Sequence, residues 1–466
     1  MPLILTPFRF YNFRLWTTAN SVSVTGTWMQ VLAANWLLLA ATGSAAQMGL
    51  GVLAHAGPAV LLGPWAGTLA DRLPARPLLT ITQLAHALLA ALIGIVAISG
   101  GTVVPVVYGA LLLGGVVSAV EGPAFGRFGS LMVDQSHLGA ALAAGSLTCS
   151  AGRIIGMSAG GALVAAVGPG PLFLANAASF LAVIGVLYLL RPGASGFPGS
   201  AGAVDLPVPR QAATGHSNAP DAAPEPHPVT TWAGLRYLCR DPMVPITLGL
   251  AFLLGSLGRN YQVTMAAMSA GPLDGGPDAY GMLSTVFAAG TIAGGLLAGR
   301  AGRFRLSHLA VVGLGMSALQ ALSGLAPGVL WFAATLLPIA AAAVLVDTVV
   351  ATRMQLDNPI ALRGRVLGAV GATGAVAGAV GAPVMGWLSD VIGPRAALGL
   401  AGILTVVGSA VALAGYTAVR RRREVGLTGT PAEAPAEVGA GTEPAPADPA
   451  PADPAPAGRA GALQPA

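Results

Sequence analysis

Charged residues are scarce in this sequence. They make up 9% of its 466 residues, and lysine is missing altogether, so all 23 basic residues are arginine. A phosphate-binding loop of the form Gly-x-x-x-x-Gly-Lys therefore cannot exist here, which excludes an ATPase built on that loop. The two cysteines, Cys149 and Cys239, are too few for a disulfide framework.

Long apolar runs take the place of the missing charge. The sequence is 54% hydrophobic, and its mean hydropathy is +0.73, which is typical of a membrane protein. A bilayer crossing needs roughly 20 mostly apolar residues, and such lengths favour helices over the short alternating strands of a barrel. The first run is too long for a signal peptide and is expected to be retained. Twelve spans are predicted, at 14–40, 47–70, 77–99, 103–126, 139–167, 171–190, 242–268, 279–299, 306–325, 328–352, 366–388 and 394–419.

The arginines predict the orientation of these spans, because arginine near a helix end resists translocation. With a cytoplasmic N-terminus, Arg395 alone falls outside, and Arg153 and Arg259 fall within the membrane. The net charge of +5 thus orients the chain, and it does not indicate nucleic-acid binding. The arginines expected inside are Arg9, Arg14, Arg72, Arg76, Arg127, Arg191, Arg210, Arg236, Arg240, Arg300, Arg303, Arg305, Arg353, Arg363, Arg365, Arg420, Arg421, Arg422, Arg423 and Arg459.

Two polar segments divide the chain. Residues 192–230 are rich in Pro, Gly, Ala and Ser and are typical of a flexible linker. Residues 424–466 repeat Pro-Ala-Asp and Pro-Ala-Pro, a composition that cannot bury a core and that predicts a disordered cytoplasmic tail. The predicted domains are therefore a six-helix bundle at 1–191 and a second six-helix bundle at 231–423.

The two halves share an internal repeat with an offset near 226. Glu121 is followed six residues later by Arg127, and Asp347 is followed six residues later by Arg353. Gly67-Thr-Leu-Ala with a following Arg72 also recurs, as Gly295-Leu-Leu-Ala before Arg300. Parallel six-helix halves of this kind build a large class of transporters, whose substrate site lies between the halves.

The motifs of this sequence resemble those of the major facilitator superfamily, and within it the bacterial exporters of enterobactin and macrolides. The resemblance runs from about residue 8 to 419. It implies an all-α integral membrane fold with twelve transmembrane helices in two pseudo-symmetric bundles. The residues that carry it are Asn12-Phe-Arg-Leu-Trp16, Gly67-Thr-Leu-Ala-Asp71-Arg72 with Arg76, Arg153-Ile-Ile-Gly156 through Gly160-Gly161, Gly234-Leu-Arg-Tyr237 with Asp241-Pro242, and Arg363-Gly-Arg-Val366.

The loop between the second and third spans is a predicted conformational latch. The resemblance implies that Asp71 contacts the start of the eleventh helix, whose N-terminal dipole is positive, while the cytoplasmic side is closed. Arg72 or Arg76 would then reach the acid at Glu121. A plain topology signal explains the arginines equally well, although it does not explain Asp71.

Glu121 and Asp347 lie inside predicted helices, where a lone charge costs roughly 2.5 to 3.5 kcal/mol or more. Each acid pairs with the arginine of its own half, Arg127 or Arg353, or one of them takes up a proton during the cycle, because burial favours the neutral acid. The repeated spacing favours pairing. Both acids and Arg353 are therefore gating candidates, and both acids are candidates for proton coupling.

The two membrane arginines, Arg153 and Arg259, lack a counterpart in the other half. A buried guanidinium keeps its proton and needs an acid, carbonyl groups or an anionic ligand. Neutralisation by Glu121 and Asp347 and contact with an acidic substrate are both open.

Polar side chains on two further helices predict walls of the substrate cavity. Asn20, Ser23, Thr27 and Gln30 share one face of the first span, and Ser256, Asn260 and Thr264 follow each other at fourfold spacing in the seventh. Such stripes face either a water-filled cavity or another helix, and the family topology favours the cavity.

His55 and His86, in the second and third spans, could lie at similar depth. Packed neutral histidines are the favoured interpretation, so we expect no cofactor and no metal.

We therefore predict a secondary transporter, not an enzyme, that exports a small amphipathic molecule such as a siderophore, antibiotic or drug-like metabolite by proton antiport. A proton carrying one charge across about 100 mV supplies roughly 2.3 kcal/mol. The expected partners are the substrate, protons and the lipid bilayer, and the expected form is a monomer in the bacterial cytoplasmic membrane with both termini inside. A solute uptake symporter and a non-transporting receptor or assembly protein are the alternatives.

Overall fold

A computed structural model describes residues 6–101, 103–130, 132–133, 135–190, 243–258, 260–300, 306–356 and 360–428. The predicted linker at 192–230 lies outside these residues, as does the predicted tail beyond Thr428. In the described residues all regular structure is helical.

The first half folds into the six predicted spans, preceded by a short 3-10 turn. Another 3-10 turn comes before the fifth span, and each helix coincides with an apolar run because its backbone must satisfy its own hydrogen bonds in lipid. The elements are η1 (Thr6–Arg9), α2 (Tyr11–Thr42), α3 (Ala45–Arg72), α4 (Ala75–Ser99), α5 (Val103–Ser130), η2 (Gln135–His137), α6 (Leu138–Val167) and α7 (Pro169–Leu189).

The second half repeats this order with one interruption. Its seventh span, predicted as one run at 242–268, is divided into two helices around Asn260. The last helix continues to Thr428, beyond the predicted border of the tail. The elements are α9 (Met243–Leu257), α10 (Tyr261–Ala270), α11 (Gly276–Arg300), α12 (Leu306–Ser323), α13 (Val329–Leu356), α14 (Ile360–Ile392) and α15 (Pro394–Thr428).

By length and composition, 10 helices of the described chain can each cross a bilayer. The other two predicted spans are the divided one and α12, whose described apolar part is the shorter stretch Val311–Ser323. The twelve predicted spans are therefore all represented by helix.

The internal repeat is visible in the helix boundaries. The helices α5 and α13 are both 28 residues long, and their first and last residues shift from 103 to 329 and from 130 to 356, an offset of 226. Gly168 and Gly393 each join two helices at a positive φ, 78° and 84°, which glycine adopts without steric cost. A proline that starts the next helix follows each of them.

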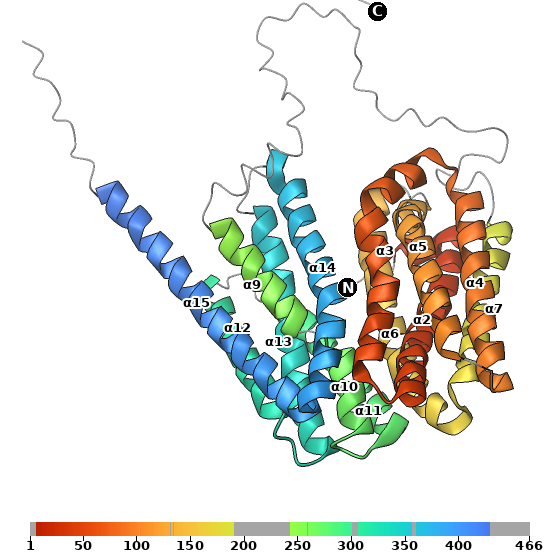
Figure 1. The fold of residues 1–466 in the computed structure, drawn as a ribbon. Coiled ribbons are helices and arrows are strands. Elements are labelled where there is room, and N and C mark those ends of the chain that lie inside the picture. Colours follow the sequence, from red (N-terminus) through yellow and green to blue (C-terminus); the bar gives the residue numbers. More distant parts are fainter. Residues whose placement is uncertain are drawn as a thin grey trace, which may run out of the picture. The chain divides into compact units, whose positions relative to one another are not determined.

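Helices pack within each half, and the halves meet mainly through two helix pairs, with further contacts of α10 on α2 and α3. In the first half α2 packs on α6 and α7, while α3 packs on α5 and α4 packs on α7; in the second α11 packs on α13 and α9 packs on α14. Between the halves α3 lies along α14, and α6 lies along α11 (Figure 1). One buried apolar cluster includes residues of both halves, so part of the core lies where they meet.

Candidate functional site

Small residues let the two halves meet at one end of the helices. Gly49 of α3 lies against the backbone of Ala382 and Pro383 in α14, and a Cβ on this glycine would collide with it. Gly386 of α14 is packed in the same way against the backbone of Ala45. We call this region, where α3 begins and α14 ends, the closed end.

The second pair of helices touches at the same end. Gly161 of α6 and Gly281 of α11 are so close that a Cβ on either would overlap the backbone of the other. The Asn35 amide of α2 donates a hydrogen bond of 3.5 Å to the hydroxyl of the buried Tyr280, whose ring stacks on Trp36 at 6.1 Å. These contacts join α2 and α6 to the start of α11.

A carboxylate from one half caps a helix of the other half at the closed end. Asp390 of α14 accepts hydrogen bonds from the Ser44 hydroxyl at 2.5 Å, the Ala45 N–H at 2.8 Å and the Ala46 N–H at 3.0 Å. These donors stand at the N-terminus of α3, where the backbone N–H groups lack helical partners and the dipole is positive. The cap exists only while α3 and α14 touch at this end.

Arg395 lies near this end as well. Its guanidinium donates to the carbonyl oxygen of Ala326 at 3.1 Å and to that of Pro272 at 3.5 Å. Both acceptors lie in short connections, one between α12 and α13 and the other between α10 and α11. Arg395, the arginine predicted to lie on the outer side of the membrane, thus joins two loops to the start of α15 by hydrogen bonds.

Toward their other ends α3 and α14 separate. Gly67 lies five turns from Gly49 on the same face of α3, and Gly371 lies three turns from Ala382 on α14. A Cβ on Gly67 or Gly371 would meet no atom within 4 Å. We call this region, where α3 ends and α14 begins, the open end.

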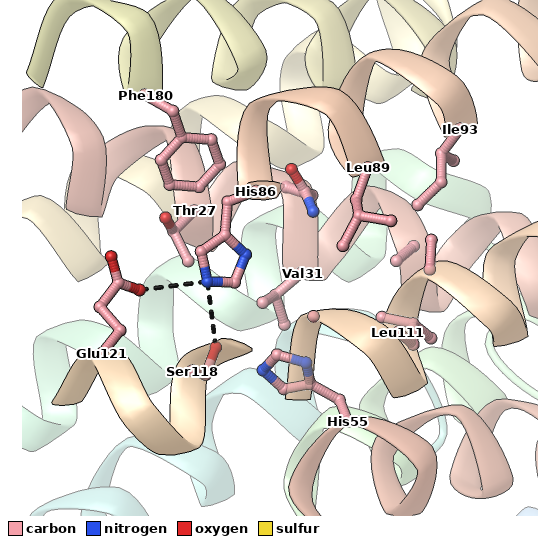
Figure 2. Close-up of a pocket in the computed structure, with 14 residues that line it drawn as sticks. Thr27, Val31, His55, His86, Leu89, Ile93, Leu111, Ser118, Glu121 and Phe180 are labelled. Carbon is pink, nitrogen blue, oxygen red and sulfur yellow. Dashed lines mark hydrogen bonds and ion pairs between the residues drawn. The ribbon is translucent and has the colours of Figure 1, made fainter. Parts of the chain in front are cut away.

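The first half also encloses a pocket of its own, with a volume of about 140 Å³ (Figure 2). It is formed between α2, α3, α4, α5 and α7, all of them helices of the first half. Its space suits a few water molecules, each of which occupies roughly 30 Å³ in the liquid, rather than a drug-sized ligand. The lining residues are Thr27, Gln30, Val31, Ala34, His55, His86, Leu89, Ile93, Ala110, Leu111, Gly114, Ser118, Glu121 and Phe180.

Glu121 is the polar centre of this pocket. Its Oε1 accepts hydrogen bonds from the Gln83 amide at 2.6 Å and the Thr82 hydroxyl at 3.2 Å, and its Oε2 lies 3.1 Å from Nε2 of His86. The same His86 nitrogen is 3.4 Å from the Ser118 hydroxyl. The acid of α5 is therefore held mainly by α4, through groups that can share or pass on a proton.

His55 faces the same pocket from α3, as Figure 2 shows. Gly114 leaves room for both imidazoles, because a Cβ at this position would lie 3.9 Å from the His55 ring and 3.9 Å from the His86 ring. The predicted similar depth of the two histidines is thus seen in the structure. In the described residues no group of three His, Cys, Asp or Glu side chains could hold a metal ion.

Two residues of the polar stripe on α2, Asn20 and Ser23, are buried within the first bundle. The amide of Asn20 lies 3.8 Å from the Cys149 sulfur of α6. For Asn20 these contacts support helix packing, the alternative to a cavity wall.

The other two members of the stripe line the internal pocket. Gln30 accepts a hydrogen bond of 2.6 Å from the Asn176 amide of α7. Thr27 lines the pocket and remains exposed. Thr27 is therefore the member of the stripe that combines solvent contact with a place in the pocket.

At the interruption of the seventh span, the side chain of Asn260 satisfies backbone carbonyl groups at the end of α9. The Asn260 amide donates to the carbonyl oxygens of Ser256 at 2.6 Å and Gly255 at 3.3 Å, which are among the last carbonyls of α9. Ser256 and Thr264 are both buried. Gly381 of α14 lies so close to this break that a Cβ there would collide with Ser256 and Asn260. In this conformation α14 covers the break.

Arg153 lies in the middle of α6 and faces Trp28 of α2. The guanidinium carbon is 4.5 Å from the centroid of the indole ring. Its Nε is buried and has no hydrogen-bond partner. Arg259, the second membrane arginine, falls outside the described residues.

Arg72 and Arg76 of the predicted latch do not contact Glu121 in this conformation. Asp71 belongs to the last turn of α3, but its side chain is outside the described part. Arg72 is exposed, and the guanidinium of Arg76 lies 5.6 Å from the ring centroid of Tyr188 in α7. A contact between these arginines and Glu121 would need a different state.

The equivalent acid of the second half is less well defined. Asp347 is partly buried on α13. The side chain of Arg353, its predicted partner, lies outside the described part. So does the side chain of Arg127, the predicted partner of Glu121. Pairing of either acid with its own arginine thus stays a prediction.

Two functional positions were missed in the sequence. His86 was assigned a packing role, since its contact with Glu121 depends on how α4 and α5 pack. Asp390 received no role, although an acid beside the C-terminal end of a membrane helix is unfavourable for the helix dipole and signals a partner elsewhere.

Comparison by sequence matched the first half of the chain to a known family. Residues 4–196, less than half of the chain, match the profile of the transmembrane secretion effector family. A search of curated proteins by sequence found no match.

Solved structures of low sequence identity share the whole fold. The nucleoside transporter NupG matches with a TM-score of 0.66 at 12% identity, over 87% of this chain and 99% of that one. A bacterial homolog of the human lysosomal transporter Spinster, described as inward-facing and unoccupied, matches with 0.65 at 16%, over 89% and 98%. A D-xylose-proton symporter matches with 0.63 at 14%, over 86% and 97%. The chain therefore has the major facilitator fold, and its first half matches the transmembrane secretion effector family.

Proposed function

We propose that the chain is a secondary transporter that exports a small amphipathic molecule by alternating access and is driven by proton antiport. The observation that carries the proposal is the one-sided contact between the halves. Helices α3 and α14 touch at Gly49 and Ala382 and separate toward Gly67 and Gly371. A pair of bundles that closes one end while leaving the other free is one state of an alternating-access cycle.

The arginine distribution supports the assignment of sides. If arginine-rich loops stay in the cytoplasm, the open end with the loop after Arg72 faces the cytoplasm. The closed end with Arg395 then faces outward. The state described is inward-facing under this assignment, which is the state in which an exporter collects its cargo.

Export is supported by the description of the matched family as a secretion effector. The D-xylose-proton symporter among the structural neighbours keeps uptake as the second candidate. Both candidates use the same fold and differ in the direction of net flux.

For the coupling ion, Glu121 is favoured over Asp347 as the proton-binding acid. Glu121 lies 3.1 Å from His86 and lines a pocket with room for water. A proton on this carboxylate removes a buried negative charge, and its loss restores the pair with the imidazole. The pocket also contains the exposed Thr27, which offers water a way in.

Inverted membrane vesicles with an acidic interior test the direction. We expect at least one of 2,3-dihydroxybenzoate, erythromycin and ethidium to enter these vesicles and to raise their internal pH, reported by a trapped pH dye. Vesicles without the protein are the control. Flux of these compounds out of the vesicles together with protons would indicate uptake symport, and binding without flux would indicate a receptor.

A further inference from the structure

Arg153 has no counterion among the described side chains of the first bundle. In the part of the chain that the structure describes, its guanidinium makes no hydrogen bond or ion pair, and its contact is the Trp28 ring at 4.5 Å. A guanidinium keeps its charge in a protein. A cation–π contact contributes only part of what a carboxylate partner would supply.

Glu121, the acid of the first bundle whose side-chain contacts the structure describes, is engaged elsewhere. Both carboxylate oxygens of Glu121 are occupied by α4, through Gln83 and Thr82 on one side and His86 on the other. Glu121 faces the pocket between α2, α3, α4, α5 and α7, whereas Arg153 lies on α6. Glu121 therefore does not neutralise Arg153 in this structure.

The helix geometry places Arg153 at the border of the face of α6 that packs on α2, on the side of the face that meets α11. Residues on α6 are about 100° apart, so this side chain lies between the face that packs on α2 through Gly156 and Gly160 and the face that meets α11 at Gly161. It is also about 12 Å from Gly161 along the helix axis, toward the open end. Cys149, one turn farther in that direction, is exposed.

We propose that the transported molecule is a small organic anion whose carboxylate, or a similar oxyanion, binds Arg153. The inference rests on the proposed transport function and names the chemical class of its cargo. The guanidinium offers two parallel N–H donors that match the two oxygens of a carboxylate. Trp28 lies 4.5 Å from the guanidinium carbon, and this cation–π contact uses none of the N–H donors.

Cys149 is a native reporter for this site, since it lies one turn from Arg153 and is exposed. The experiment uses the purified full-length Cys239→Ser protein in detergent and measures the rate at which a maleimide modifies Cys149. The probes are salicylate and 1-naphthoate, each compared with its uncharged amide. We expect both acids to slow the modification and both amides to have no effect.

Variants of Arg153 give the decisive comparison. Loss of a charge-assisted contact in Arg153→Gln should weaken protection by the acids roughly 10- to 100-fold. Arg153→Lys keeps the charge without the fork and should be intermediate. Arg395→Gln removes the same charge at a distant loop contact and should bind like the parent protein.

The proposal is overturned if neither acid protects Cys149, if the amides protect equally well, or if Arg153→Gln binds the acids normally. Thermal unfolding of unliganded Arg153→Gln checks the fold, and removal of an unpaired cation is expected to leave its melting temperature at or above that of the parent. This experiment measures binding and does not depend on flux across a membrane. A protein that binds the acids at Arg153 and never changes state would refute the transport function, whereas a transporter whose Cys149 the acids do not protect would refute this inference alone.

Discussion

Asp390 near the end of α14 accepts a hydrogen bond of 2.5 Å from the hydroxyl of Ser44, the residue that begins α3. The two residues belong to different halves of the chain, so this bond joins the bundles directly. The neighbouring N–H groups of Ala45 and Ala46 donate to the same carboxylate. The cap therefore stabilises the state in which this end is closed.

Removal of the Asp390 charge should shift the balance between the two states. Asp390→Asn loses the favourable interaction with the N-terminus of α3, about 1 kcal/mol, which corresponds to a roughly fivefold larger population open at this end. Asp390→Ala should shift it further, because the acceptor is lost as well.

A cysteine at Asn35, in a chain whose native cysteines are serine, reports this shift. Asn35 is buried beside Tyr280 and becomes accessible when the halves part. Its labelling rate by a membrane-impermeant maleimide should rise in both Asp390 variants. Asp278→Asn removes an acid from the first turn of α11 and is the matched control. Unchanged labelling in Asp390→Ala would show that the cap has no part in closure.

The contact of Gly161 with Gly281 should tolerate no side chain. A methyl group in Gly161→Ala would overlap the backbone of α11, and such overpacking costs about 1 to 3 kcal/mol. We expect the closed end to open and the labelling of a cysteine at position 35 to rise at least fivefold. Gly145→Ala on the same helix has no atom within 4 Å of the new Cβ and should behave like the parent. Equal labelling of the two variants would contradict this reading of the interface.

Glu121→Gln should uncouple transport from the proton gradient. The amide keeps the shape of the acid, and it cannot take up and release a proton. We expect accumulation of cargo driven by a pH gradient to fall at least tenfold in vesicles, which is the general scale of a lost buried charge contact. Exchange of labelled for unlabelled cargo should continue when the pH is equal on both sides of the membrane.

His86→Gln should weaken the same coupling by a smaller factor, because Gln83 and Thr82 still hold the carboxylate. His137→Gln alters a half-buried histidine ahead of α6, away from the pocket, and serves as the control. Gradient-driven accumulation at the parent level in Glu121→Gln would exclude this acid as the proton site.

The sequence predicted the helices and their repeat, because both depend on information local to each span. Apolar runs of membrane length determine where helices form, and the offset of 226 reappears in the bounds of α5 and α13. The division of the seventh span was missed, since the run around it is continuously apolar. Gly258 and Asn260 were the signals for a break, as these residue types disfavour the helix interior.

The residues that line the internal pocket together could not be predicted from the sequence. Glu121 was recognised as costly, yet its partners His86 and Gln83 come from a different helix, at a register that packing alone determines. The Asp390 cap depends in the same way on α14 lying beside α3. Periodicity shows which residues share a face of a helix and does not show which helix that face meets.

A disulfide between positions 44 and 390 tests the central claim, that the two halves part at the closed end during transport. In a chain whose native cysteines are serine, Ser44→Cys with Asp390→Cys places two thiols where the hydroxyl and carboxylate now touch. Oxidation should abolish vesicle transport of the probe, reduction should restore it, and each single variant should be unaffected by oxidant. Transport that continues at the parent rate in fully cross-linked protein would contradict the account.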